Sequence, residues 1–398
     1  MGAEQPGRMK MRDDRAPVIG LRARLIAIAI AVIVSLGLCE LMARAMYPAP
    51  QDPTREPRIL FQRRPGGFFL HVPGQRGWMD DGFVTVNALG LRGPEVETPK
   101  PSGTRRVLAI GDSTTFGLGV NDDGTYVAQL NARLGALGFE ERWEAINGGV
   151  SGYNMTLASA FLKHMAPVIE PDVVLVGVFW NDLPYESISP DGEVPVLAPA
   201  IGETPSDSDG ASEPASAAVV NVDQVSDTPF RIGNQLSTAN RFLRKSRLLY
   251  VLRQTWLSAI APTDAANHEV RWEVALLEGN RSPAIDFAWH DLEGRLAGIR
   301  DLGRAGGYEV GVVAMPIRAQ VEGSYPDAAY QARIAVIAGS LGLFVVDPLP
   351  RFLAHPEPSA LFIPYDRMHY TALGNGEVAE AVFDAVGRRI AAREPAQH

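Results

Sequence analysis

Short apolar segments alternate with amphipathic helical segments along most of this chain, and this alternation most restricts the fold. The strongest apolar segment, 173–179 (VVLVGVF), is apolar on both faces, as a central strand of a parallel sheet is. Strands that alternate with helices predict a parallel sheet covered on both faces. We therefore expect a flavodoxin-like, three-layer α/β domain with about five parallel strands. The expected strands are 107–110, 143–146, 173–179, 309–315 and 343–346, and the expected helices are 125–137, 156–166, 285–303, 328–339 and 371–392.

Two further segments carry secondary-structure signals outside this alternation. Residues 67–72 and 82–87 suggest a small β-hairpin ahead of the main domain. Residues 238–260 predict an amphipathic helix, and a basic helix of this kind can lie on anionic lipid. Packing on its own domain is the commoner arrangement and the one that we expect. The apolar side carries Phe242, Leu249, Leu252, Trp256 and Ile260, and the basic residues elsewhere are Arg241, Arg244, Lys245, Arg247 and Arg253.

The amino-terminal region predicts one transmembrane helix. Residues 25–39 form an uninterrupted apolar run, and residues 41–46 bring it close to the length that a bilayer core requires. Residues 1–24 carry six basic residues against three acidic ones, which predicts a cytoplasmic amino terminus and a main domain outside the membrane. A signal peptide cleaved near 43–45 is the alternative. Lipidation of Cys39 is disfavoured, because Leu38 occupies the position where a small residue is expected.

Residues 186–230 interrupt the strand–helix pattern with a strongly acidic segment. It contains nine acidic residues and no lysine or arginine, so the rest of the chain accounts for none of the net charge of −9. This composition predicts a solvated, disordered insertion. The mild acidity argues against non-specific nucleic-acid binding, and one cysteine excludes a disulfide framework and a Cys-cluster zinc site. The expected organisation is a basic tail at 1–24, an anchor at 25–46, a linker with a β-rich lead-in at 47–82 and the main domain at 83–398.

A serine stands where the first predicted strand meets a helix. Ser113 follows strand 107–110, at the position where a parallel sheet presents a nucleophile. Near the carboxyl end, Asp366 precedes His369 by three residues on one loop. A serine hydroxyl needs a base to take its proton, and that base needs a partner to orient it. The combination predicts Ser113 as nucleophile, His369 as base and Asp366 as the orienting carboxylate.

Two further segments follow predicted strands and offer hydrogen-bond donors. The glycine-rich segment 147–154 follows the second strand, and Asn181 follows the third. Glycine lets a backbone N–H approach a ligand closely, and an asparagine amide is a neutral donor suited to an oxyanion. All these segments should meet at one edge of the sheet.

Taken together, these blocks resemble the SGNH or GDSL hydrolase superfamily over residues 83–392, apart from the acidic insertion. The resemblance implies an oxyanion hole formed by Ser113, Gly152 and Asn181 beside the triad. Residues 87–93 (NALGLRG) look like the lead-in of membrane-anchored bacterial members. Phe179 departs from the pattern, which often has glycine there, and this bears on the room around the acyl group. No motif for a metal, nucleotide or flavin accompanies these residues, so we expect no cofactor.

Three functions compete at this stage. The first is a serine esterase that removes acetyl or other short acyl groups from small esters or from esters of surface or wall glycans. The second is an O-acetyltransferase of extracytoplasmic polysaccharide that uses the same triad. The third is a non-catalytic glycan-binding or assembly protein. The presence of every residue of the triad and of the oxyanion hole argues against it. In each case the expected location is the cytoplasmic membrane, with the domain on the periplasmic side, and the oligomeric state stays open.

Overall fold

The computed structural model describes residues 20–136, 141–183, 244–260, 268–323, 325 and 328–393. The chain divides into two compact units, of which the first comprises Met1–Ala49 with Thr238–Leu257. The second unit comprises Pro50–Ser237 with Ser258–His398 and contains the sheet. The acidic insertion predicted at 186–230 lies outside the described residues.

The second unit is built on a parallel sheet of five strands in the order β6-β5-β7-β8-β9. Numbered along the chain, this is the order 2-1-3-4-5 of flavodoxin-like sheets, which confirms the predicted fold class. All six residues of β7 are buried, as expected for a central strand that helices cover on both faces. The strands are β5 (Thr104–Gly111), β6 (Arg142–Gly149), β7 (Val173–Val178), β8 (Glu309–Ala314) and β9 (Phe344–Val346).

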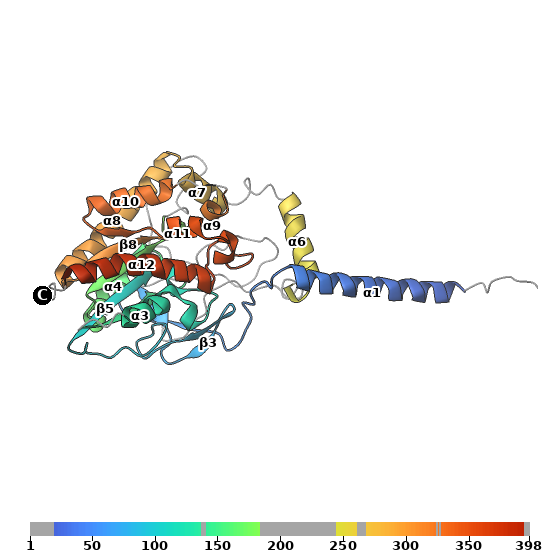
Figure 1. Ribbon diagram of the computed structural model, residues 1–398, viewed down its shortest axis with the longest axis horizontal. Helices are drawn as coiled ribbons and strands as arrows, with labels where there is room; N and C mark the ends of the chain where they lie inside the picture. Colours follow the sequence, from blue (N-terminus) through green and yellow to red (C-terminus); the bar gives the residue numbers. More distant parts are fainter. Residues whose placement is uncertain are drawn as a thin grey trace, which may run out of the picture. The chain divides into compact units, whose positions relative to one another are not determined.

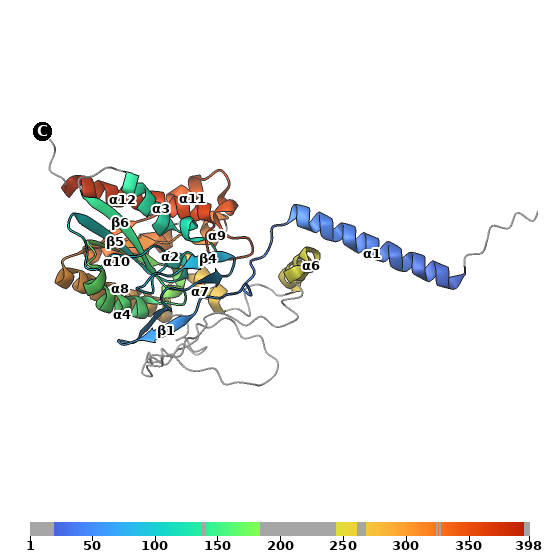
Figure 2. The same cartoon turned by 90° about the horizontal axis from the view of Figure 1, so that it is seen from below.

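Helices cover both faces of this sheet (Figure 2). On one face α3 packs against β6 and against α12, and on the other α4 and α8 pack together. The five helices predicted between and after the strands are all present, with ends that differ by a few residues. They are α3 (Tyr126–Ala136), α4 (Met155–Ile169), α8 (Pro283–Gly306), α10 (Ala329–Ser340) and α12 (Ala372–Arg393). The structure also contains short elements that were not predicted: α2 (Ser113–Phe116), α7 (His268–Leu277), α9 (Arg318–Val321), α11 (Leu349–Ala354) and the 3-10 turns η1 (Asp122–Gly124), η2 (Trp180–Asp182) and η3 (Pro358–Leu361).

The segment ahead of the sheet forms two hairpins, where one had been predicted. Strand β1 (Phe61–Arg64) pairs with β2 (Phe68–His71), and β3 (Arg76–Met79) pairs with β4 (Gly82–Thr85), both antiparallel. The predicted strands at 67–72 and 82–87 therefore exist but do not pair with each other. Each one instead pairs with the segment just before it across a tight turn, because a short connection is the easiest way to join antiparallel strands.

In the first unit, α1 (Leu21–Met46) is the one helix in the described residues that is long and apolar enough to cross a membrane. Its apolar stretch has a mean hydropathy of 2.6 and no buried residue. The predicted helix at 238–260 corresponds to α6 (Arg247–Ile260). Residues 238–243 lie outside the described residues. This helix is grouped with α1 in the first unit, and the expectation that it packs on the main domain stays a prediction.

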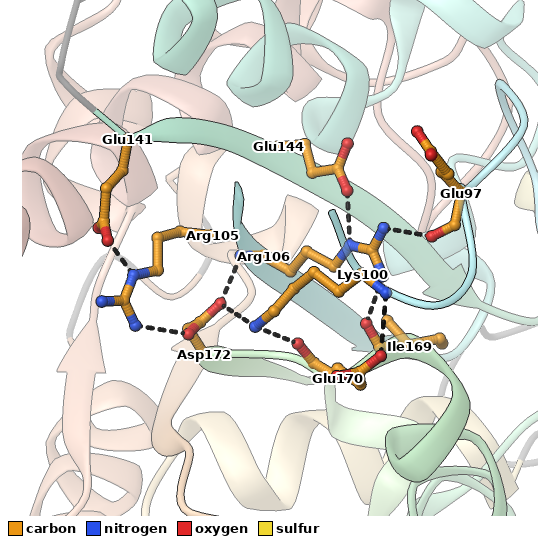
Figure 3. Close-up of polar contacts among 9 residues, drawn as sticks. All are labelled: Glu97, Lys100, Arg105, Arg106, Glu141, Glu144, Ile169, Glu170 and Asp172. Atoms are coloured by element: carbon orange, nitrogen blue, oxygen red, sulfur yellow. Dashed lines mark hydrogen bonds and ion pairs between the residues drawn. The ribbon is translucent and has the colours of Figure 1, made fainter. Parts of the chain in front are cut away.

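At the amino-terminal edge of the sheet, a buried arginine ties three segments together (Figure 3). The Arg106 side chain is completely buried and pairs with Glu144 at 2.5 Å. It also donates to the carbonyl oxygens of Ile169 and Glu97 at 2.7 and 2.5 Å. The next residue back, Arg105, is 43% exposed and pairs with the exposed Glu141 and with Asp172, which is only 11% exposed. Two adjacent arginines thus both form ion pairs, but one side chain is completely buried and the other is partly exposed to solvent.

We expect Arg106→Met to lower the free energy of unfolding by about 3–5 kcal/mol, because it leaves a carboxylate and two carbonyls without their donor. Arg105→Gln should lower it by about 1 kcal/mol or less, since solvent screens its ion pairs. Urea denaturation of both variants checks the difference. Equal losses for the two would contradict this assignment of buried and surface pairs.

Candidate active site

The carboxyl ends of β5 and β7 form the point where the strand order reverses, and ligands of such sheets bind at that crevice. Ser113 begins the four-residue helix α2 directly after β5, with Asp112 as its cap. The Asp112 carboxylate accepts hydrogen bonds from the backbone N–H and the hydroxyl of Thr114, at 2.8 and 2.6 Å. The turn therefore holds the serine at the first position of a capped helix, at the edge where the site is expected.

Three of the predicted site residues form one chain of hydrogen bonds. The Nε2 atom of His369 lies 2.8 Å from the Oγ atom of Ser113. Its Nδ1 atom lies 2.8 Å from an oxygen of Asp366. The other carboxylate oxygen of Asp366 accepts from the backbone N–H groups of Met368 and His369 at 2.8 and 2.9 Å. The loop thus fixes the carboxylate, and the carboxylate fixes the imidazole ring.

Burial and charge act in opposite directions on this pair. Burial lowers the pKa of His369, but the charge and the hydrogen bond of Asp366 outweigh it, and the pKa lies above its ordinary value. Burial raises the pKa of Asp366. The charge of His369 and the hydrogen bonds that Asp366 accepts lower this pKa by more, so it lies below its ordinary value. The arrangement therefore favours a charged Asp366 and makes His369 a stronger base than a free imidazole.

The amide of Asn181 lies beside the turn that carries Ser113. Its Nδ2 atom donates to a carboxylate oxygen of Asp112 at 3.1 Å, and its Oδ1 atom is buried without a partner. A carboxylate accepts hydrogen bonds only, so this contact fixes which end of the amide carries the N–H groups. The carboxylate of the next residue, Asp182, accepts a hydrogen bond from the backbone N–H of Phe179 at 2.8 Å. Burial, together with the charge of Asp112, raises the pKa of Asp182 well above its ordinary value.

Glycines allow the turns at this edge to approach one another. Gly152 has a φ of +84° and lies exposed between buried neighbours, a conformation that glycine adopts without strain. A Cβ atom on Gly149 would lie 2.4 Å from the backbone nitrogen of Phe116. One on Gly177 would lie 2.3 Å from the hydroxyl of Thr115. The strand ends therefore let α2 sit directly on the sheet. The ring of Phe179, which departs from the family pattern, is completely buried.

Two arginines that the sequence analysis assigned no role hold the turns of the site. Arg92 is buried and donates to the carbonyl oxygens of Phe116 and Gly117 at 3.1 and 2.7 Å, at the carboxyl end of α2. It also donates to the Val120 carbonyl oxygen at 2.6 Å and pairs with Asp122 at 2.9 Å. A cation is favourable at a helix carboxyl terminus, where carbonyl groups lack partners.

The second arginine, Arg318, supports the loop of the base. It donates to the carbonyl oxygens of Ile363 and Asp366 at 3.1 and 2.5 Å. Arg92 lies in the lead-in motif at residues 87–93, and this position could have indicated from the sequence that it supports the site. Nothing in the sequence around Arg318 distinguishes it from a surface arginine.

If Ser113 is the nucleophile, as the sequence predicts, Arg92→Met should lower kcat by about 10- to 100-fold with little change in KM, because α2 loses its fixed carboxyl end and Ser113 shifts. Kinetics with a small activated ester check this, and Arg76→Gln, an exposed arginine of β3, is the control. A change confined to KM would contradict a role in placing the nucleophile.

In the part of the chain that the structure describes, no group of three or more His, Cys, Asp and Glu side chains is arranged to hold a metal ion. The polar groups described around Ser113 are a hydroxyl, an imidazole, carboxylates and amides. They can exchange protons with a bound molecule and donate hydrogen bonds to it.

No protein-family model matches this sequence, and no curated protein sequence matches it significantly. Among solved structures, TesA is similar at 13% identity over 71% of this chain and 99% of that chain, with a TM-score of 0.39. A lipase/acylhydrolase from Enterococcus faecalis is 12% identical over 74% of this chain and 100% of that chain, with a TM-score of 0.36. The acetylxylan esterase Axe2 from Geobacillus stearothermophilus is 15% identical over 71% and 94%, with a TM-score of 0.38. Likenesses of this degree do not bear on activity, which has to follow from the site itself.

Proposed function

We propose that this chain is a serine ester hydrolase of the SGNH type, which acts through an acyl-enzyme on short-chain esters. The observation that carries the proposal is the chain of hydrogen bonds from Ser113 through His369 to Asp366, with both distances at 2.8 Å. This constellation of nucleophile, base and orienting carboxylate is the one that acyl transfer to serine requires. Its position at the carboxyl edge of the sheet, at the reversal of strand order, agrees with where such folds bind ligands.

The proposed reaction has two halves. In the first, the Oγ atom of Ser113 attacks the ester carbonyl carbon while His369 takes the hydroxyl proton. The tetrahedral intermediate collapses, and His369 returns the proton to the leaving alcohol. In the second half a water molecule attacks the serine ester, and its proton passes through His369 to the Ser113 oxygen. The acid product leaves, and the enzyme regains its starting state.

The proposed oxyanion hole contains the backbone N–H groups of Ser113 and Gly152 and the side-chain amide of Asn181. An asparagine amide carries two N–H groups, and one of those of Asn181 is directed to Asp112. We assign the other one to the substrate oxygen. Asp112 is then a positioning residue, since it orients the amide and caps the helix of the nucleophile.

We expect Asn181→Ala to lower kcat by about 10²–10³-fold, because an oxyanion donor acts mainly in the transition state. Asn154→Ala is the matched control. That asparagine lies at the same edge but caps α4 by accepting from the Leu157 N–H, so its loss should reduce stability and leave kcat unchanged. Turnover of p-nitrophenyl acetate by both variants checks the assignment. Wild-type kcat in Asn181→Ala would remove this residue from the proposed hole.

The proposed location is the cytoplasmic membrane, with α1 as a single span and the hydrolase unit on the periplasmic side. The length and apolarity of α1 support the span, and the basic residues before it support the orientation. An anchored enzyme outside the cytoplasm meets glycan esters of the wall or cell surface. We propose acetyl or other short acyl groups on such glycans as its substrates.

The experiment that tests the function is turnover of p-nitrophenyl acetate by the full chain in detergent. A serine-reactive phosphonate is added in parallel, and the modified peptide is identified by mass spectrometry. We expect turnover, together with modification of Ser113. An absence of both would reject the hydrolase and favour the non-catalytic binding role. Turnover that rises when sugar acceptors are added, with acetylated sugar as product, would identify an O-acetyltransferase that uses the same residues.

A further inference from the structure

The first unit joins two helices that lie about two hundred residues apart in the sequence. The carboxyl end of α1 and α6 lie near each other (Figure 1). Glu40 of α1 is hydrogen-bonded to the residues at which α6 begins. Its carboxylate accepts hydrogen bonds from the Ser246 hydroxyl at 2.8 Å and from the backbone N–H groups of Arg247 and Leu248, both at 2.9 Å. The start of α6 is therefore held beside the carboxyl end of α1.

This contact is favourable for electrostatic reasons. The first N–H groups of a helix have no partner within the helix, and the positive end of its dipole attracts an anion. The same carboxylate pairs with Arg44 of α1 at 2.7 Å, and Arg44 in turn donates to the Lys245 carbonyl oxygen at 3.1 Å. A carboxylate near the end of an apolar helix is thus neutralised by an arginine and by the amino end of a second helix.

α6 carries an exposed apolar pair and a group of basic residues. Leu249 and Leu252 are 38% and 55% exposed, although they are large and apolar. Three residues apart, they lie on one face of the helix. The basic residues of α6 and of the turn before it are Arg244, Lys245, Arg247 and Arg253. Exposed leucines beside lysine and arginine are typical of helices that lie in the plane of a membrane interface.

We propose that α6 lies on the bilayer surface at the end of α1, with Leu249 and Leu252 at the boundary of headgroups and acyl chains. The arginines and the lysine then contact the phosphates of anionic phospholipids, which their charge complements. The proposal rests on the membrane span proposed for α1. If α1 crosses the bilayer, then Glu40 lies near the end of the span, and its hydrogen bonds hold the start of α6 at the depth of the interface.

The test uses the full chain reconstituted in vesicles of phosphatidylcholine and phosphatidylglycerol. An NBD fluorophore is attached to Leu252→Cys or, as the control, to Gln254→Cys, about two hundred degrees further round the helix. Both substitutions are made in a Cys39→Ser background, because Cys39 is the only native cysteine. The same label on native Cys39 reports whether α1 lies in the bilayer. Quenching by lipids that carry a nitroxide on the acyl chain measures contact with the bilayer.

We expect the nitroxide lipids to quench the label at residue 252 about twofold or more above the label at residue 254. Glu40→Ala should reduce that difference, because α6 loses the contact that holds its start. Vesicles without phosphatidylglycerol should reduce it too, because the basic residues lose their counter-charges.

Equal, weak quenching at residues 252 and 254 with strong quenching at Cys39 would overturn the proposal. So would a label at residue 252 that neither nitroxide lipid nor aqueous iodide reaches, since protein would then cover it. An unquenched Cys39 label would remove the span on which the proposal rests. Turnover of p-nitrophenyl acetate by the same samples reports the hydrolase separately, so a failure of the surface contact and a failure of the proposed function can be distinguished.

Discussion

Replacing Ser113 with alanine is expected to lower kcat for p-nitrophenyl acetate by about 10⁴-fold or more. The variant lacks the atom that would form the acyl-enzyme, and neither the base nor its carboxylate can then contribute, because these residues act as one unit. The small change in side-chain volume should leave the fold intact. The melting temperature of the variant, compared with that of the wild type, checks this.

The matched control for this prediction is Ser151→Ala. Ser151 is also buried and lies at the same edge of the sheet. It should retain kcat within about tenfold, because no acyl group is assigned to it. If Ser113→Ala keeps most of its activity, or if both variants lose it equally, Ser113 is not the nucleophile. The phosphonate label should disappear in Ser113→Ala and persist in Ser151→Ala.

The second large effect is expected from Asp366→Asn, with a loss of about 10³–10⁴-fold in kcat/KM. The carboxylate accepts from the His369 ring, whereas an amide presents both a donor and an acceptor and no longer fixes the tautomer. The wild-type pH profile carries related information. Only neutral His369 can accept the serine proton, so kcat/KM should fall as the pH drops through the His369 pKa, which Asp366 holds above its ordinary value.

In Asp366→Asn this acidic limb should move to lower pH, because the largest of the charges that raise the pKa of His369 is gone, and only Asp112 and Asp80 then oppose the effect of burial. Measurement of kcat/KM from about pH 5 to pH 9 for both proteins checks the shift. His290→Gln is the control, since that histidine is 84% exposed and lies on α8. An acidic limb that stays in place in Asp366→Asn, or one that moves in His290→Gln, would contradict the assignment of the base.

The parts of the molecule that could be predicted from sequence are those set by local patterns. Strand β7 is recognisable because six consecutive buried positions require an unbroken apolar run. Ser113 and Asn181 could be placed together in advance, because each follows a strand and parallel strands end at a common edge. The link from His369 to Asp366 is three residues long and is contained in one loop.

The parts that could not be predicted depend on contacts between distant segments. Arg92 and Arg318 donate to backbone carbonyl groups, which every residue carries, so residue type did not mark these partners, although Arg92 itself lies in a recognisable motif. The pairing of the lead-in hairpins depends on turn geometry, which the alternation of apolar residues alone does not determine. The association of α6 with α1 depends on contacts of Glu40 and Arg44 with residues about two hundred positions away, and amphipathicity gave no indication of them.

The hydrogen bond between Ser113 and His369 joins residues that are 256 positions apart, which has a consequence for when the enzyme becomes active. A chain is synthesised from its amino terminus, and on the proposed location it is also exported in that order, so it presents the serine long before the histidine. The strands up to β8 can form a sheet while the nucleophile still lacks its base, because contacts of such long sequence separation form late. On the proposed function, an incompletely exported chain is therefore inert toward esters, and activity begins only when the loop after η3 docks beside α2.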